Sequence, residues 1–259
     1  MNRTGLGIVL VAGAVVGVVF AVQPLLDIAI SRVFFNETYR VFPVQYSLVA
    51  RHLRDIFIYV IAALAAPAFI AIALKLILPH RQMLIAGRAA IFLIATLALA
   101  PGLMANVILK DFWGRPRPAE IQEFYGPEKF VPWWDPRGSC DKNCSFVAGE
   151  GAGGFWTLAP AALAPPAWRA IAYGAAFLFG SAAGLLRLSG GAHFFTDVVF
   201  SGVFTFLIVW IVRGLIYRWR TRLTDEQVER TIERIALPGR EIIDWIVARI
   251  RERRARERL

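Results

Sequence analysis

The sequence predicts an all-α, polytopic membrane protein built as a bundle of six membrane-spanning helices. Hydrophobic residues make up 57% of the 259-residue chain, above the average of about 45–50% for soluble domains. Many of them lie in apolar runs near the length of about 20 residues with which a helix crosses a bilayer. Short polar turns and one long polar loop, residues 110–150, separate these runs. The pattern therefore indicates a helical bundle with a single large loop on one face.

We expect the six spans at residues 6–26, 56–78, 89–109, 152–164, 169–186 and 194–217. The first run is longer than the apolar core of about 7–15 residues in a signal peptide, and no clear cleavage site follows it, so an uncleaved span is expected. Between the first two spans, residues 31–55 alternate aromatic and charged side chains, as segments at a membrane interface do. Pro101 is expected to kink the third span, and Pro165 and Pro166 end the fourth.

We divide the chain into a membrane domain, residues 1–217, and a basic tail, residues 218–259. In the tail, Thr224 and Gln227 have the spacing of a capping box at a helix start. The pair Pro238-Gly239 predicts a break, and a second helix follows it with isoleucines on one face and arginines elsewhere. Such a helix can lie on the inner leaflet. A solvated tail helix or a self-association surface is equally compatible with the pattern.

The charge pattern predicts the partner and the orientation. The net charge of +10 forms no continuous basic groove with interleaved aromatics, so we expect a membrane surface and no nucleic acid as partner. The tail has 12 Arg against 8 acidic residues, whereas loop 110–150 has 6 basic and 7 acidic residues. The positive-inside rule then places both termini in the cytoplasm and the loop on the outer face. Four arginines in the first outer loop run against this bias.

Alternation of six spans brings three polar clusters to one side of the membrane. In the first cluster, Lys110 supplies a point charge and Arg117 a planar fork, both suited to phosphate oxygens. Cations next to a span also act as simple membrane anchors. In the second cluster, small residues surround Ser145 and Gly149 at the start of the fourth span, where free backbone N–H groups favour an anion. Close helix packing is the structural alternative.

The third cluster, Arg187 to Asp197, holds an arginine, a histidine and an aspartate between two apolar spans. If a helix starts near His193, Asp197 lies one turn further on the same face and can hold the imidazole in one tautomer. A structural histidine at a helix end is the plainer reading. Together, the three clusters fit the binding of a phosphate and nucleophilic attack on it.

The combined spacing Lys-x6-Arg-Pro, a Ser/Gly-rich helix start and Arg-x5-His-x3-Asp resembles the phosphatidic-acid-phosphatase type 2 superfamily, whose integral-membrane members dephosphorylate lipids. The resemblance covers about residues 89–217. It implies that Lys110, Arg117 and Arg187 bind the phosphate. It also implies that His193 is the nucleophile that forms a phosphohistidine, with Asp197 orienting and activating it. Neither a metal nor another cofactor is expected, because the cations neutralise the phosphoryl charge.

The second motif departs from the family pattern. Members usually read Pro-Ser-Gly-His where this chain has Val147-Ala148-Gly149-Glu150, and Leu186 replaces a common serine in the third motif. Glu150 is expected to replace the usual histidine as general acid, which requires a raised carboxyl pKa. Cys140 and Cys144 are expected to form a disulfide in an oxidising periplasm, with free thiols as the alternative.

Within the family, the Cys-Ser-Phe-Val-x-Gly-Glu and Trp-Gly-Arg-x-Arg-Pro segments look most like bacterial lipid A phosphatases, which remove the 1- or 4′-phosphate. We therefore expect a lipid phosphatase of the bacterial inner membrane with its active site on the periplasmic face. Undecaprenyl diphosphate and phosphatidylglycerophosphate are alternative substrates. Lipid-to-lipid phosphotransfer and a non-catalytic lipid-phosphate binder are alternative functions. The sequence does not fix the oligomeric state.

Overall fold

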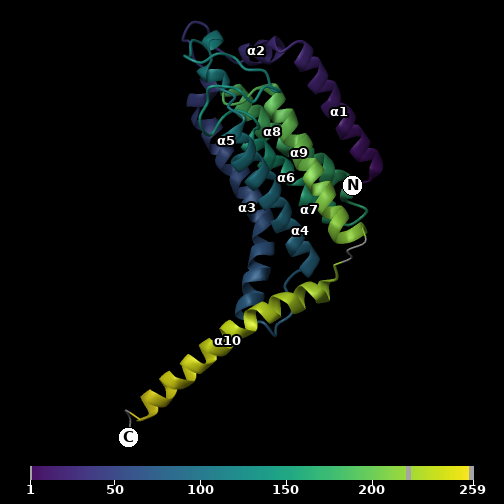
Figure 1. Cartoon of the computed structure of the whole chain (residues 1–259), viewed down its shortest axis with the longest axis vertical. Coiled ribbons are helices and arrows are strands. Elements are labelled where there is room, and N and C mark those ends of the chain that lie inside the picture. The colour runs from purple at the N-terminus through teal and green to yellow at the C-terminus, as the bar shows by residue number, and fades with distance from the viewer. Residues whose placement is uncertain (1, 220–222, 257–259) are drawn as a thin grey trace. The chain divides into compact units, whose positions relative to one another are not determined.

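The computed structural model describes residues 2–219 and 223–256, and this part of the chain is helical without a β-strand. Figure 1 shows the order of the elements along the chain. The α-helices are α1 Arg3–Val22, α2 Leu25–Arg32, α3 Leu48–Ile77, α4 Gly87–Leu97, α5 Lys110–Phe112, α6 Gly149–Trp156, α7 Leu158–Leu163, α8 Arg169–Ser189, α9 Phe195–Arg213 and α10 Asp225–Arg256. The other helical elements are η1 Pro43–Tyr46, η2 Ala98–Leu109, η3 Pro118–Glu120, η4 Gln122–Phe124 and η5 Gly214–Arg218.

Five helices in the described part of the chain are long and apolar enough to cross a bilayer. They are Arg3–Val22, Leu48–Ile77, Gly87–Phe112, Arg169–Ser189 and Phe195–Arg218. The fourth predicted span falls on α6 and α7, which are 8 and 6 residues long and are interrupted at Thr157. Its hydroxyl donates to the carbonyl of Gly154 at 2.7 Å. An all-helical membrane architecture is confirmed, whereas a count of six spans is not.

The third span is irregular around Pro101, where a kink was expected. A proline inside a helix removes one backbone donor and crowds the preceding turn. From Ala98 to Leu109 the helix widens into π-type turns, and the Asn106 amide donates to the carbonyl of Pro101 at 2.7 Å. This side chain adds a hydrogen bond to a carbonyl of the irregular segment, as is common next to a proline in a membrane helix.

The chain divides into two compact units, of which the first comprises residues 1–64 and 95–214. At its centre, α6 packs against α8, α9 and η2. The contact with α8 is close at two glycines, since a Cβ added at Gly154 would lie only 2.9 Å from the Cα atom of Gly180. Helix α1 runs beside α9, as Figure 1 shows. This unit contains all three of the polar clusters.

The second unit comprises residues 65–94 and 215–259. The predicted capping box is confirmed, since Thr224 N donates to the Gln227 side chain and Gln227 N donates to the Thr224 hydroxyl. Inside this unit, the Arg88 guanidinium donates two hydrogen bonds to one carboxylate oxygen of Asp225, and the buried Lys75 ammonium lies 3.5 Å from a Glu229 oxygen. These pairs fix the start of α10 within the unit.

The predicted break at Pro238-Gly239 is wrong. Helix α10 continues through Pro238 to Arg256. A proline cannot donate to the preceding turn, but several of its neighbours, Arg234, Ala236, Leu237 and Arg240, are residues with high helix propensity. The loss of one backbone hydrogen bond is therefore a local defect, and the helix resumes.

Candidate active site

Four stretches of the first unit bring the proposed catalytic and phosphate-binding side chains together. Lys110 lies at the end of the third span and Arg117 follows it, Glu150 lies in the first turn of α6, Arg187 lies in the last turn of α8, and His193 precedes α9. The first and last of these residues, Lys110 and His193, are more than 80 positions apart in the sequence. Helices α6, α8 and α9 contact one another, so their ends hold the polar groups in register.

The His193 imidazole is buried, with 1% of the residue exposed. Its Nδ1 atom lies 2.7 Å from the backbone carbonyl oxygen of Ser145. Since a carbonyl oxygen only accepts, Nδ1 carries the proton in this contact and Nε2 keeps its lone pair. Burial lowers the pKa of His193, although the charge of Asp197 opposes the shift. The ring is therefore neutral at physiological pH with Nε2 available as a nucleophile.

The Asp197 carboxylate lies farther from the His193 imidazole than the four-residue spacing of the two residues predicts. The shortest approach of its carboxylate to Nδ1 is 3.8 Å, which is too long for a hydrogen bond. Its oxygens instead accept hydrogen bonds from the Ser145 hydroxyl, from the backbone N–H of Phe194 at 2.7 Å and from Arg115 at 2.5 Å. Asp197 thus holds the segments on both sides of the ring and adds a negative charge near it.

Sequence reasoning missed the buried network behind Asp197. The Arg115 guanidinium is fully buried and bridges Asp197 and Asp27, which it contacts at 2.8 Å. Asp27, in α2, also accepts from the backbone N–H and the hydroxyl of Thr196. Buried charges are tolerated when they are paired and hydrogen-bonded in this way. The network links the N-terminal helices to the start of α9.

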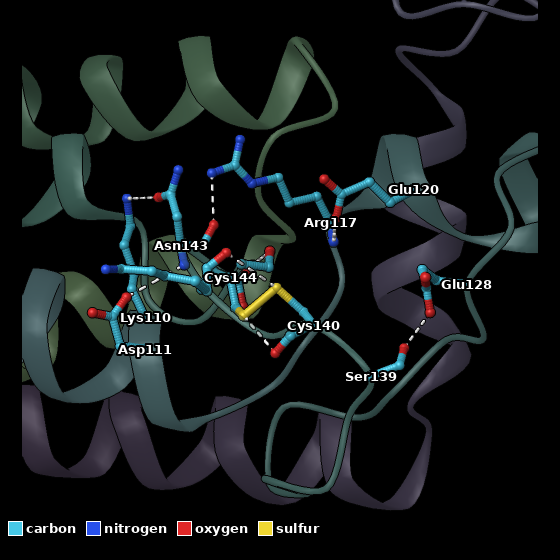
Figure 2. The surroundings of a disulfide bond; sticks show 12 residues. Lys110, Asp111, Arg117, Glu120, Glu128, Ser139, Cys140, Asn143 and Cys144 are labelled. Atoms are coloured by element: carbon cyan, nitrogen blue, oxygen red, sulfur yellow. Dashed lines mark hydrogen bonds between the residues drawn. A yellow bond between two sulfur atoms is a disulfide. The ribbon is translucent and has the colours of Figure 1, made fainter.

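A disulfide-closed loop lies against the two cations of the first motif, as Figure 2 shows. Cys140 and Cys144 are bonded, with Cα atoms 5.8 Å apart. Asn143 in this loop accepts a hydrogen bond from the Lys110 ammonium through its side chain, at 3.3 Å, and one from Arg117 through its carbonyl, at 2.7 Å. Its φ of 55° is one that asparagine tolerates better than most residues. One residue thus holds both cations.

Glu150 is held by two arginines. Arg54, from α3, donates two hydrogen bonds to its carboxylate, at 2.6 and 3.0 Å. Arg187 approaches the same carboxylate with its Nε atom at 3.4 Å. That Nε atom is buried and has no hydrogen-bond partner among the described residues. Sequence reasoning did not single out Arg54, because a lone arginine at a helix start has no distinguishing pattern.

The start of α6 is packed tightly onto the first motif. A Cβ added at Gly149 would lie 2.4 Å from the Asn106 side chain and 3.1 Å from the Lys110 ammonium nitrogen. Glycine is therefore required for close approach at this position. Ser145, expected to contact the substrate, lies in the buried network beside Asp197 and does not line the cleft described next.

A cleft of about 420 Å³ is lined by two residues of the candidate site, Arg117 and Arg187. Its charged lining comprises Arg51, Arg54, Arg117, Arg187 and Glu120. Gly190, Gly191 and Ala192, directly before His193, form part of its wall. Four arginines against one carboxylate make this cleft strongly attractive for an anion.

Comparison with known proteins identifies the family. The sequence model of the PAP2 superfamily matches residues 89–224, which is more than half of the chain. The chain belongs to the PAP2 superfamily. The matched region contains the three motifs and the histidine just described, and it excludes α1, α2 and α3.

Curated relatives of this PAP2 protein include lipid A 4′-phosphatases. The protein from Francisella tularensis subsp. novicida is 46% identical over 51% of this chain and 60% of its own length. The protein from Rhizobium leguminosarum is 32% identical over 52% of this chain and 54% of its own length. The matched segments thus cover less than two thirds of these relatives. No solved structure matches this PAP2 chain significantly.

The departure from the usual second motif has a visible structural result in this PAP2 protein. Ala148 stands where the family usually has a serine, and its backbone N–H donates to the carbonyl of Asp197 at 3.2 Å. The backbone therefore still ties the start of α6 to α9 without a hydroxyl. Glu150 stands at the position of the usual histidine and forms the ion pairs with Arg54 and Arg187.

Proposed function

We propose that this PAP2 protein is a membrane phosphatase that removes a phosphate from a lipid A-type glycolipid, at the 4′ position. The names of two relatives support the substrate and the position. The observation that carries the proposal is the orientation of the buried His193, whose Nδ1 is bound to the Ser145 carbonyl. A neutral imidazole with its Nε2 lone pair unprotonated, within reach of the charges of Lys110 and Arg187, suits attack on a phosphate.

The proposed reaction has two steps. In the first, Nε2 of His193 attacks phosphorus, the bond to the lipid oxygen breaks, and the phosphoryl group is transferred to the ring. The lipid oxygen leaves as a hydroxyl after it takes up one proton, from solvent water or, if Glu150 is the general acid, from its carboxyl group; the water that attacks in the second step returns one proton. In the second step, water attacks phosphorus, the P–N bond breaks, and inorganic phosphate is released. Lys110, Arg117 and Arg187 neutralise the charge that spreads over the phosphoryl oxygens in both steps.

The location of the site follows from the proposed topology. We propose that α6 and α7 together form a fourth crossing of the membrane, which makes six crossings with both termini in the cytoplasm. The active site then faces the periplasm of a bacterial inner membrane, where the cleft meets phosphorylated lipid of the outer leaflet. The disulfide between Cys140 and Cys144 supports this orientation because such bonds persist in oxidising compartments.

The contacts of Glu150 bear on its proposed role as general acid. A general acid must hold a proton before it donates one. Two arginines around one carboxylate favour its ionised form, so they oppose this role. If Glu150 nevertheless supplies the proton, Glu150→Gln will slow hydrolysis of alkyl phosphates more than that of activated aryl phosphates. Equal slowing of both would remove the general-acid assignment.

Phosphate release by the purified protein tests the function. The substrates are lipid A, undecaprenyl diphosphate and phosphatidylglycerophosphate, each measured with the wild type and with His193→Ala. We expect release from lipid A, loss of the 4′-phosphate by mass spectrometry and no release by the variant. Preferred release from another lipid would change the substrate. Labelled phosphate recovered on a second lipid would indicate phosphotransfer, and lipid binding without release, unaffected by His193→Ala, would indicate a non-catalytic binder.

A further inference from the structure

Arg54 adds a fourth cation to the site and comes from a helix outside the region that the family model covers. It lies in α3, close to its start, whereas Lys110, Arg117 and Arg187 all lie within the matched region. Its guanidinium lines the same cleft as Arg117 and Arg187. Its two charge-assisted hydrogen bonds to Glu150 use both oxygens of the carboxylate, a geometry specific to arginine.

The charge balance of the cleft explains why such a cation is needed. The Glu150 carboxylate lies 3.4 Å from the Nε atom of Arg187, the proposed phosphate ligand. Without Arg54, the carboxylate would have Arg187 as its nearest cation and would compete with the phosphate for it. It would also repel a dianionic phosphate bound to Arg187. With Arg54 in place, both carboxylate oxygens accept a hydrogen bond from Arg54, and the buried Arg187 Nε has no hydrogen-bond partner among the described residues.

We propose that Arg54 is a positioning residue of the phosphatase site, which acts through Glu150 by neutralising that carboxylate and keeping Arg187 available for the substrate phosphate. This inference rests on the proposed function and assigns Glu150 a positioning role in place of proton donation. It also predicts that the Arg54–Glu150 pair matters for substrate binding more than for the chemical step, because the pair controls the charge that the phosphate meets in the ground state as well as in the transition state.

A double-mutant cycle tests the proposal with four proteins, the wild type, Arg54→Gln, Glu150→Gln and the double variant. Phosphate release from lipid A gives KM and kcat for each. We expect Arg54→Gln to raise KM about tenfold and to change kcat little, since both side chains are partly exposed and coupling energies of contacting pairs are about 0.5–3 kcal/mol. In the Glu150→Gln background the same substitution should change KM by less than about threefold.

Arg51→Gln is the matched control. Arg51 lies one turn before Arg54 on α3, is exposed and lines the same cleft, but the structure shows no ion pair for it among the described residues. Its substitution should have the same effect with Glu or Gln at position 150. Arg54→Lys keeps the charge and loses the planar fork, so its KM should lie between that of the wild type and that of Arg54→Gln. Elution and thermal unfolding of each variant in detergent identify those that fail to fold.

Three results would overturn the proposal. If Arg54→Gln raises KM equally in both backgrounds, Arg54 acts on the substrate directly. If the loss is in kcat alone, the pair has no role in phosphate binding. If Glu150→Gln slows alkyl phosphates more than aryl phosphates, Glu150 is the proton donor. Failure of the proposed function looks different, because the wild type would then release no more phosphate than His193→Ala does.

Discussion

The buried guanidinium of Arg115 offers the sharpest test of how the site is held together. Arg115→Met keeps much of the side-chain volume and removes the charge that lies between Asp27 and Asp197. All three side chains are at most 2% exposed, so both carboxylates would remain buried without their cation. Removing one partner of a buried ion pair typically costs about 3–5 kcal/mol. We expect the melting temperature to fall by roughly 6–20 °C, at 2–4 °C per kcal/mol for a chain of this size.

The loss should also depend on pH. Burial already raises the pKa of Asp27, and Arg115 opposes that rise, so Arg115→Met will raise the pKa further. A carboxyl with a higher pKa in the folded state than in the unfolded state binds its proton more tightly when folded. Stability therefore increases as pH falls through the folded-state value. The difference between variant and wild type should be smaller at pH 5 than at pH 8.

Thermal unfolding in detergent at one scan rate, followed by tryptophan fluorescence, measures the effect. Arg137→Gln is the control, because Arg137 forms an ion pair with Asp135 on the surface, where its side chain is 80% exposed. Its loss should have no measurable effect. Asp27→Asn combined with Arg115→Met should recover part of the stability, since one of the two stranded charges is removed. The reasoning is refuted if Arg115→Met and Arg137→Gln shift the melting temperature equally.

Three further predictions concern the site itself. kcat/KM should fall at acidic pH as His193 takes up a proton, and the midpoint of this fall should lie below about pH 6.5 because burial lowers the pKa of the ring. A midpoint at or above that pH, unchanged between substrates of different phosphate pKa, would contradict this. Gly149→Ala should raise KM about tenfold, because its methyl group would crowd the ammonium nitrogen of the phosphate-binding lysine, whereas Gly174→Ala, with nothing within 4 Å of the added Cβ, should not change KM. Replacing Cys140 and Cys144 by serine should lower the free energy of unfolding by only roughly 2 kcal/mol, because the disulfide closes a short loop. It should also raise KM, because that loop holds both cations of the first motif. An unchanged KM would show that the disulfide is dispensable for substrate binding.

The helical membrane fold was predictable because it depends on local patterns. For four of the five long helices in the described residues, the apolar runs predict both ends to within a few residues. The capping box at Thr224 depends on only four neighbouring residues. The second span is the exception, since α3 begins at Leu48, eight positions earlier than expected. Charged residues in its first turns obscured the start of the helix in the sequence, and two of them, Arg51 and Arg54, line the polar cleft.

Residues of the candidate site could be proposed from the sequence only where they form a motif. Lys110, Arg117, Arg187 and His193 stand in short, fixed spacings, whereas their partners do not. Arg54 meets Glu150 across 96 positions, and Asp27 meets Thr196 across 169. A single charge in an N-terminal segment has no pattern that distinguishes it from a membrane anchor. Such pairings become visible only when the packing of the helices is known.

The position of Asp27 has a practical consequence for dissecting the molecule. Its carboxylate reaches the network behind the histidine from α2, far upstream of residues 89–224. A fragment trimmed to the homologous segment would leave the Arg115 guanidinium without one of its two counter-ions and would also lose Arg54. Truncation or domain-exchange experiments should therefore retain the first three helices. Loss of activity in a shorter fragment would report a missing counter-charge and would say nothing about the chemistry of the shared motifs.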